Sequence, residues 1–461
     1  MSQIATPLPG IDISPLRAFF EAGITRSLKV RLQYLEALEK AIRAKEPLIL
    51  EALKQDLGKS QFEAYAAEVG FVLDELGYIR RNLPSWVRPR RFWPSLAQLP
   101  GQTELRYEPR GVVLILSPWN YPFQLLLSPL VGAIAAGNVV VLKPSEFAPA
   151  TAEIVEALVK EVFPPEYVRV VQGDAKVAAA LLEEDWDYIF FTGSTRVGRL
   201  IAEAAAKRLI PYTLELGGKS PAIVEADAAI DLAARRIAWG KWLNAGQTCI
   251  APDYVLVHES RLEPFLRALK EAIHRFYGPD LTRPPADYAR IIHANHYNRL
   301  VRLLQEGEVV FGGHVDAEAL YISPTVLLSP RGELLEEEIF GPLLPVIPYT
   351  KPEEAVAFVR RLPSPLAIYV FSESPEWQAY YLDRLPSGGA CINDTLMHIA
   401  SPRLPFGGVR QSGIGRYHGW YSFETFSHAR AVVKTPTWLD LPLRYPPYTS
   451  LKQRLLRWLI G

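Results

Sequence analysis

Cys249 is one of only two cysteines in the 461 residues, and it lies in the stretch "KWLNAGQTCI" (241–250). A free cysteine is commonly a small buried apolar residue, which is one interpretation of this position. Its neighbours favour another, because Gly, Gln and Thr form a small polar loop in which the backbone can approach a ligand. The loop follows a helical pattern and precedes a predicted strand, "IAPDYVLV". This setting is typical of a thiolate nucleophile.

Two polar side chains lie where predicted strands give way to loops. Glu215 belongs to an apolar, strand-like run in "LELGGKSP", just before two glycines. A carboxylate in an apolar setting has a raised pKa and can act as a general base, although a strand-end glutamate that faces solvent fits the same pattern. Asn120 follows the strand-like "VVLIL" in "SPWNYP". Its amide can donate a hydrogen bond to an oxyanion.

Two further motifs suggest ligand binding less specifically. In "FTGSTRVG" (191–198) an apolar run meets small residues and then a predicted helix, whose N-terminus can hold a phosphate. The motif is not GxGxxG and does not by itself predict a nucleotide site. In "HANH" (293–296) two histidines lie three positions apart. No third ligand is evident, so no metal site is predicted.

Composition narrows the classes of protein. Fifty basic residues balance fifty acidic ones, which gives no support for a nucleic-acid partner. The two cysteines, Cys249 and Cys391, do not form a disulfide framework, and core packing is the better interpretation of Cys391. The start shows no signal peptide, and the longest apolar run (123–137) is short and contains Pro129. We therefore expect a cytoplasmic protein.

The order of predicted elements indicates two α/β domains. Helical periodicity occupies 31–57 and 62–83, and a basic, Pro-rich connection follows at 84–101. From residue 111, runs rich in Val, Ile and Leu alternate with helical stretches, which is typical of parallel sheets covered on both faces. The alternation resumes after "YTLELGGKSP" (212–221) with a second set of elements.

Taken together, the motifs resemble one family. The pieces "PWNYP", "GAIAAGN", "VLKPSE", "TGSTRVG", "LELGGKSP", "NAGQTC", "EEIFGP" and "LPFGGV" occur in the order typical of NAD(P)-dependent aldehyde dehydrogenases. Further stretches, among them "RIAWGKW" and "GRYHGWYSFETFSH", resemble the class 3 and fatty aldehyde dehydrogenase branch. The resemblance implies an α/β fold with two parallel-sheet domains and a small β oligomerisation arm. It also implies a homodimer.

The resemblance assigns chemical roles to the candidates. Cys249 matches the nucleophile, which would form a thiohemiacetal and then a thioester. The Asn120 amide and the Cys249 backbone N–H would hold the oxyanion. Backbone dipoles and the charge of the cofactor would favour the thiolate. Glu215 matches the residue that activates Cys249 or the deacylating water. Glu338 matches a ligand of the nicotinamide ribose, with Phe340 beside it. In this branch either carboxylate could serve as the base.

The resemblance also implies a cofactor site and a substrate tunnel. Lys143 and Glu146 match ligands of the adenosine ribose, and NAD is expected to be preferred with NADP tolerated. Ser194 matches a pyrophosphate contact, while Gly193 and Gly198 permit close backbone approach. The branch implies apolar aldehydes, aliphatic of medium to long chain or aromatic. Four residues near the motifs would line an apolar tunnel: Trp119, Tyr121, Trp242 and Leu243.

The resemblance sets expected domain boundaries. The cofactor domain would occupy 1–82 and 104–214, and the catalytic domain 215–385. Segments 83–103 and 386–445 would build the oligomerisation arm. Two other functions remain possible: an acyl-CoA or acyl-thioester reductase that uses the same cysteine, and a non-catalytic structural or binding role.

The C-terminal tail (446–461) has its own pattern. Leu451, Leu455, Trp458 and Leu459 fall on one face of a short basic amphipathic helix. About twelve residues cannot span a bilayer, which needs roughly twenty. Either the helix docks on its own protein, or it lies on a membrane surface or caps the substrate mouth.

Overall fold

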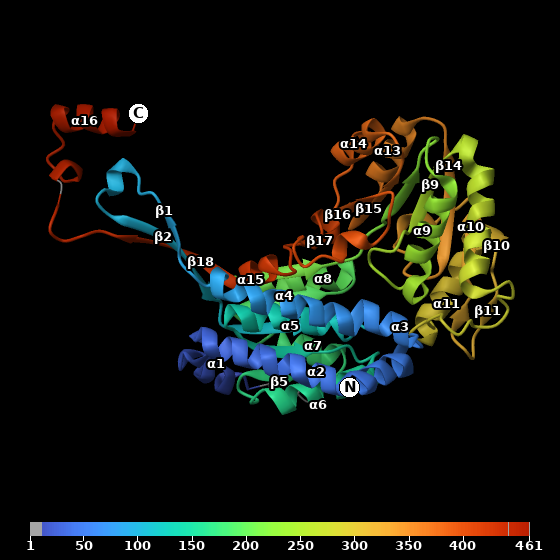
Figure 1. Ribbon diagram of the computed structural model, residues 1–461, viewed down its shortest axis with the longest axis horizontal. Coiled ribbons are helices and arrows are strands. Elements are labelled where there is room, and N and C mark those ends of the chain that lie inside the picture. Colours follow the sequence, from blue (N-terminus) through green and yellow to red (C-terminus); the bar gives the residue numbers. More distant parts are fainter. Residues whose placement is uncertain (1–11, 441, 461) are drawn as a thin grey trace, which may run out of the picture.

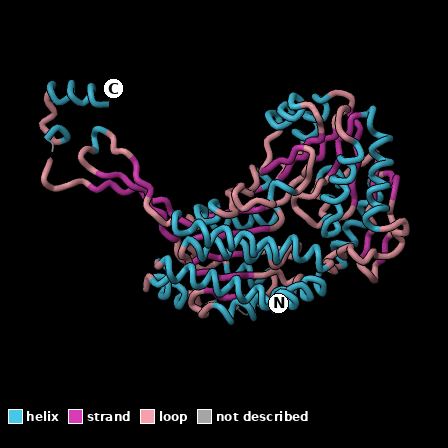
Figure 2. Tube along the Cα trace, in the orientation of Figure 1, coloured by secondary structure: helices cyan, strands magenta, loops and turns pink. Residues whose placement is uncertain are grey.

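The computed structural model describes residues 12–440 and 442–460, and it contains two α/β bodies with a projecting β arm (Figure 1). Residues 1–11, 441 and 461, which fall in the expected cofactor, arm and tail segments, lie outside the described residues. Figure 2 shows strands inside each body with helices around them. The expected α/β fold with parallel sheets is confirmed.

The first body contains a six-stranded sheet in the order β17-β7-β6-β3-β4-β5, parallel except for the pair β17 and β7. Its strands are β3 (Val112–Leu116), β4 (Val139–Lys143), β5 (Val168–Val170), β6 (Tyr188–Thr192), β7 (Tyr212–Glu215) and β17 (Gly413–Ile414). Every residue of β3, β4 and β6 is buried, which explains their near-continuous apolar composition.

Helices cover this sheet on both faces. They are α1 (Ser14–Glu21), α2 (Leu28–Leu57), α3 (Gln61–Ala64), α4 (Gly70–Trp86), α5 (Gln124–Ala136), α6 (Pro149–Val162), α7 (Ala175–Leu181) and α8 (Thr195–Lys207). All of α5 is buried, so the apolar run at 123–137 is a core helix. Within the described ranges, no helix combines the length and apolarity that crossing a membrane requires.

The second body contains a seven-stranded sheet in the order β10-β13-β14-β9-β8-β15-β16, parallel except for the pair β10 and β13. Its strands are β8 (Pro221–Val224), β9 (Tyr254–His258), β10 (Glu308–Phe311), β13 (Thr325–Leu328), β14 (Leu343–Tyr349), β15 (Ala367–Phe371) and β16 (Gly389–Ile392), and a separate ribbon pairs β11 (Val315–Asp316) with β12 (Tyr321–Ile322). Its helices are α9 (Ile230–Trp242), α10 (Leu262–Tyr277), α11 (Ala294–Leu303), α12 (Glu333–Glu336), α13 (Pro352–Arg361) and α14 (Pro375–Arg384).

An antiparallel three-stranded sheet forms the arm, which extends away from both bodies (Figure 1). Its strands are β1 (Arg90–Phe92), β2 (Gln102–Pro109) and β18 (Ser427–Lys434). Helix α15 (Trp420–Thr425) precedes β18, and α16 (Ser450–Ile460) follows the arm and packs on its turn at Leu96–Gln98.

The expected arm segment 386–445 is divided among three sheets. Strand β16 pairs with β15 in the second body, β17 pairs with β7 in the first, and only β18 joins the arm. At the other segment, residues 83–86 still belong to α4, and β2 continues to Pro109. Pairing between strands that are distant in sequence decides these memberships, so local composition did not reveal them.

Candidate functional site

Cys249 lies in a loop whose backbone is tightly constrained. Asn244 and Ala245 both have φ of 52°, and Gly246 follows with φ of 76°. A Cβ atom on Gly246 would lie 2.2 Å from the carbonyl oxygen of Gly341, so only glycine fits there. The loop that carries Cys249 therefore packs directly on the loop that contains Glu338. Cys249 itself is partly exposed.

Hydrogen bonds join the Cys249 loop to the Asn120 loop. Asn120 is buried, and its Nδ2 donates to the Gln247 carbonyl over 3.1 Å. In return, Asn244 Nδ2 donates to the Asn120 carbonyl over 2.9 Å. The next residues of the two loops also make a hydrogen bond, between the Tyr121 hydroxyl and Thr248 Oγ1, which lie 2.7 Å apart. Asn120 belongs to the first body and Cys249 to the second, so these bonds link the two bodies at the site.

The Gln247 side chain anchors the same loop through hydrogen bonds to backbone groups. Its Nε2 donates to the carbonyls of Arg290 (3.0 Å) and Asn244 (3.1 Å), and its Oε1 accepts the Ile292 N–H over 3.0 Å. The side chain is fully buried, so these bonds are shielded from water. Gln247 and Asn244 lie in the motif "NAGQTC", but sequence reasoning gave neither of them a role.

Two carboxylates converge on Cys249. Glu215 lies at the end of β7 and is buried, and neither carboxylate oxygen has a hydrogen-bond partner among the described residues. Burial raises the pKa of Glu215 well above its usual range. Glu338 is partly exposed, and burial, with Asp253 nearby, raises its pKa to about 8. A Cβ atom on Gly217 would lie 1.8 Å from Glu338 Oε2, so the Glu338 carboxylate rests directly on the Gly217 backbone.

The surroundings of the thiol keep it neutral. Burial raises the pKa of Cys249, and the charges of Glu338 and Glu215 raise it further. The backbone N–H groups of Cys249 and Ile250 act in the opposite direction but do not outweigh burial. The backbone groups act in the direction that the resemblance implies, which also assigns part of the effect to the charge of the cofactor. A positive charge brought near the sulfur would lower this pKa.

The residues proposed for the cofactor follow the carboxyl ends of β4 and β6, the two strands on either side of β3. Lys143 ends β4, and its Nζ lies 2.8 Å from Glu146 Oε2. Ser194 caps α8, where its Oγ accepts the Val197 N–H over 3.4 Å. A Cβ atom on Gly193 would lie 2.5 Å from the Phe191 ring, and one on Gly198 would lie 2.5 Å from Leu216 Cδ2. Open α/β sheets bind ligands at this edge.

Buried polar atoms without protein partners gather at the same edge. Within the described part of the chain, they include Ser117 Oγ after β3, Thr192 Oγ1 at the end of β6, and Asn120 Oδ1. With the two oxygens of Glu215, they follow three adjacent strands of the first sheet. Buried polar groups normally have partners, so this cluster fits a polar ligand at the edge, as a dinucleotide would be.

Phe340 is held beside Trp119. Phe340 has φ of 53°, and the Trp119 ring packs edge-on against it with centroids 5.4 Å apart. The Phe340 carbonyl lies 2.7 Å from His296 Nε2, and His293 Nδ1 accepts the His296 N–H over 3.1 Å. The two histidines of "HANH" therefore support this loop. Within 12–440 and 442–460, no group of three or more His, Cys, Asp or Glu could hold a metal ion.

The tunnel expectation needs one correction. Trp119 and Leu243 are partly exposed and Tyr121 is buried beside Thr248, but Trp242 lies fully in the core. The Trp242 Nε1 donates to the Pro342 carbonyl over 2.9 Å, so this indole ties α9 to the Glu338 loop.

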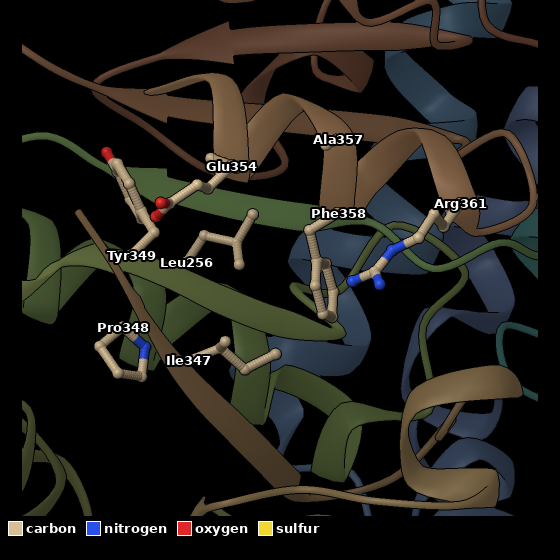
Figure 3. Close-up of a pocket in the computed structure, with 9 residues that line it drawn as sticks. Leu256, Ile347, Pro348, Tyr349, Glu354, Ala357, Phe358 and Arg361 are labelled. Atoms are coloured by element: carbon tan, nitrogen blue, oxygen red, sulfur yellow. The ribbon is translucent and has the colours of Figure 1, made fainter. Parts of the chain in front are cut away.

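A surface pocket of about 310 Å³ lies elsewhere, between α13 and the strands β9 and β14. Figure 3 shows Leu256 and Ile347 on the sheet side, with Phe358 and Arg361 on the helix. None of the residues that line this pocket belongs to the cluster around Cys249. Cys391, the other cysteine, is buried as expected.

Comparisons with known proteins identify the family that the chain matches and several of its relatives. The aldehyde dehydrogenase family pattern matches residues 17–432. The chain is 45% identical to the 4,4'-diaponeurosporen-aldehyde dehydrogenase of Staphylococcus aureus, over 94% of this chain and 95% of that protein. It is 42% identical to aldehyde dehydrogenase family 3 member A2 of Macaca fascicularis, over 96% and 92%.

Solved structures give the same result. One described as the substrate-bound state of Staphylococcus aureus AldH has a TM-score of 0.95 and 43% identity, covering 97% of this chain and 98% of that one. An aldehyde dehydrogenase from Bacillus cereus, described as an NAD+ complex, has a TM-score of 0.84 and 26% identity, covering 92% and 88%.

We predict that the alkylation rate of Cys249 in the cofactor-free protein rises with pH. Iodoacetamide reacts with the thiolate, and the raised pKa keeps the thiol protonated near pH 7. An ordinary cysteine, with a pKa of about 8.5, approaches its plateau near pH 9. The rate at Cys249 should still be increasing there, and added NAD+ should increase it at fixed pH.

Peptide mass spectrometry measures the modification, and the Cys249→Ala variant reports any reaction at Cys391. A rate that levels off below pH 8 without cofactor would show that the site already stabilises the thiolate.

Proposed function

This chain belongs to the aldehyde dehydrogenase family and is a nicotinamide-dependent oxidoreductase, and we propose that it oxidises apolar aldehydes to carboxylic acids through Cys249. The observation that carries the proposal is the convergence of Cys249, Asn120, Glu215 and Glu338 where the two bodies meet. The relatives in the family 3 branch support the choice of apolar aldehydes. They are named dehydrogenases, so the alternative of an acyl-CoA reductase is not supported.

In the proposed reaction the Cys249 thiol first loses its proton to solvent, and the thiolate then adds to the aldehyde carbon. Asn120 Nδ2 has two N–H groups, and the described contacts use one of them, toward Gln247. The other, with the Cys249 backbone N–H, would donate to the oxygen as it becomes negative. The bound nicotinamide supplies an acceptor for the hydride. Loss of that hydride leaves a thioester on Cys249.

Water must then cleave the thioester, and we assign Glu215 as the base. Its carboxylate oxygens have no partner in the part of the chain that the structure describes, whereas Glu338 accepts the Gly218 N–H. A raised pKa makes Glu215 a stronger base once it is ionised. It would take a proton from the water as the new C–O bond forms, and the acid would leave as the Cys249 thiol is restored.

NAD is the proposed cofactor, with NADP tolerated. The Glu146 carboxylate would bind the adenosine ribose hydroxyls and repel a 2′-phosphate. Lys143 lies 2.8 Å from that carboxylate and partly compensates its charge, so the preference should be modest. Glu338 and Phe340 would contact the nicotinamide ribose. Solved relatives that are described as NAD+ complexes support this cofactor.

The arm is the proposed dimer contact. A three-stranded ribbon has little core of its own, and this one leaves Trp93 97% and Phe92 52% exposed. Trp438, just after β18, is 76% exposed. Apolar side chains gathered on one projection are typical of a surface that a partner covers. A second copy of the chain is the partner that the family 3 resemblance favours.

Helix α16 is proposed as a peripheral membrane contact. Leu451 is 58%, Leu455 44% and Trp458 80% exposed, so its apolar face does not pack on its own body. The side chain of Leu459 lies outside the described residues. Lys452, Arg454 and Arg457 would attract anionic headgroups while Trp458 enters the interface.

The first prediction from the proposed function concerns substrates. Hexanal and longer aldehydes should give a higher kcat/KM than succinic semialdehyde, because Trp119, Tyr121 and Leu243 offer no cation for a second carboxylate. Production of reduced cofactor measures the rate, with NAD and with NADP, and NAD should give the higher value. Faster oxidation of succinic semialdehyde would refute the substrate class, and a higher kcat/KM with NADP would refute the cofactor preference.

A second prediction concerns assembly. Light scattering coupled to gel filtration should give twice the mass of one chain. Replacing Trp93 and Trp438 together by serine should shift the mass toward the monomer, while serine in place of Trp377, an exposed tryptophan on α14, should not. A monomeric unmodified protein would rule out the arm contact.

A third prediction concerns the tail. The protein should bind liposomes that contain anionic lipid at low salt and dissociate as salt rises, because headgroup attraction is screened. Removal of residues 450–461 should weaken this binding and slow long-chain aldehydes more than short ones. If the full chain ignores anionic liposomes and truncation leaves the chain-length preference unchanged, the helix serves only in packing.

A further inference from the structure

In two lysine–carboxylate ion pairs, the side chains of both partners are buried. Lys59 Nζ and Glu68 Oε1 lie 2.5 Å apart, with both side chains fully buried. Lys219 Nζ and Asp253 Oδ2 also lie 2.5 Å apart, with side chains 2% and 5% exposed. The remaining lysine–carboxylate pairs among the described residues are more exposed. Burial of charge is costly, so its retention at two places calls for a physical role.

The first pair holds the loop that carries Asn120. Lys59 Nζ donates to the Asn120 carbonyl over 2.8 Å and lies 4.0 Å from the centre of the Tyr121 ring. Glu68 Oε2 accepts the N–H groups of Phe123 (2.9 Å) and Gln124 (3.2 Å). These two N–H groups lie at the start of α5, where Phe123 provides no side-chain cap. The pair therefore binds this loop at Asn120 and just beyond it.

The local backbone brings both charges to this point. Lys59 follows Gly58, which ends α2 with φ of 69°. Glu68 lies in a π-helical turn, Tyr65–Val69, between α3 and α4. A π turn changes which side chains face inward, and such turns are frequent at functional sites. Neither feature is visible in the helical periodicity of the sequence.

The second pair holds the loop that carries Glu338. Lys219 Nζ donates to the carbonyls of Glu337 (2.8 Å) and Leu334 (3.0 Å). Asp253 Oδ1 accepts the N–H of Ile339 over 3.0 Å. The pair therefore holds the backbone on both sides of Glu338, at the carbonyl of Glu337 and at the N–H of Ile339. The Glu338 side chain itself takes no part in the pair.

We propose that these pairs are two separate positioning devices, Lys59–Glu68 for the Asn120 amide and Lys219–Asp253 for the Glu338 carboxylate. Both act through the backbone, so neither pair occupies the Asn120 amide or the Glu338 carboxylate. The inference rests on the proposed function, in which Asn120 holds the oxyanion and Glu338 binds the nicotinamide ribose. It predicts that each pair controls a different kinetic quantity.

The test uses two double variants that remove both charges of a pair together, Lys59→Met/Glu68→Gln and Lys219→Met/Asp253→Asn. Each variant removes both charges of its pair, so neither pair leaves one of its own charges buried alone, and each is the matched control for the other. The first should lower kcat by about tenfold or more, in the direction expected when an oxyanion donor is displaced, with the Kd for NADH changed less than about twofold. The second should raise the Kd for NADH by about tenfold.

Combination with substitutions at the positioned residues separates positioning from simple destabilisation. In an Asn120→Ala background, Lys59→Met/Glu68→Gln should cost little further kcat, and in a Glu338→Gln background, Lys219→Met/Asp253→Asn should add little to the Kd for NADH. If the losses are instead additive, or if both pairs lower kcat and cofactor affinity alike, the proposal is wrong.

If either double variant fails to fold, Lys59→Arg and Lys219→Arg keep the charge while changing the donor geometry. They should show the same separation of effects at smaller size, and its absence overturns the proposal. The unmodified protein is assayed first. If it does not oxidise aldehydes, the proposed function fails; if it does and the variants show no separation, only this inference fails.

Discussion

The hydrogen bonds between the Asn120 loop and the Cys249 loop are the contact on which the site depends. Asn120 follows a strand of the first sheet, and Cys249 follows a helix of the second body. Asn120 donates to Gln247 and accepts from Asn244, so a donor for the oxyanion and the nucleophile have a fixed relation although 129 positions separate them. These bonds fix the Asn120 loop against the Cys249 loop at the point where the two bodies meet.

The same burial that fixes this geometry sets the protonation of the site. It raises the pKa values of Glu215, Glu338 and Cys249 together, which favours the neutral forms of all three. The two carboxylates also oppose ionisation of the thiol. A neutral thiol is a weak nucleophile, and a positive charge near it would favour the reactive thiolate. This dependence suits a thiol that should react only when the hydride acceptor is present.

Local sequence was sufficient for some features and insufficient for others. The strands β3 and β4 were recognisable because burial on both faces requires continuous apolar residues. Trp242 was assigned to the tunnel because it lies beside the Cys249 motif, but tertiary packing turns its indole toward Pro342. Lys59 and Glu68 gave no local signal, since their role depends on contacts with Asn120 and Phe123, more than fifty positions away. The motif resemblance supplied chemical roles that periodicity could not.

Covalent capture of the substrate on Cys249 tests the central claim most directly. In a Glu215→Gln variant, which lacks the proposed deacylation base, a long-chain aldehyde and NAD should produce one equivalent of reduced cofactor quickly and then react slowly. Mass spectrometry of the quenched protein should find the acyl group on the Cys249 peptide and not on Cys391. If the unmodified protein oxidises the aldehyde while Glu215→Gln and rapidly quenched samples carry no acyl group on Cys249, the account is wrong.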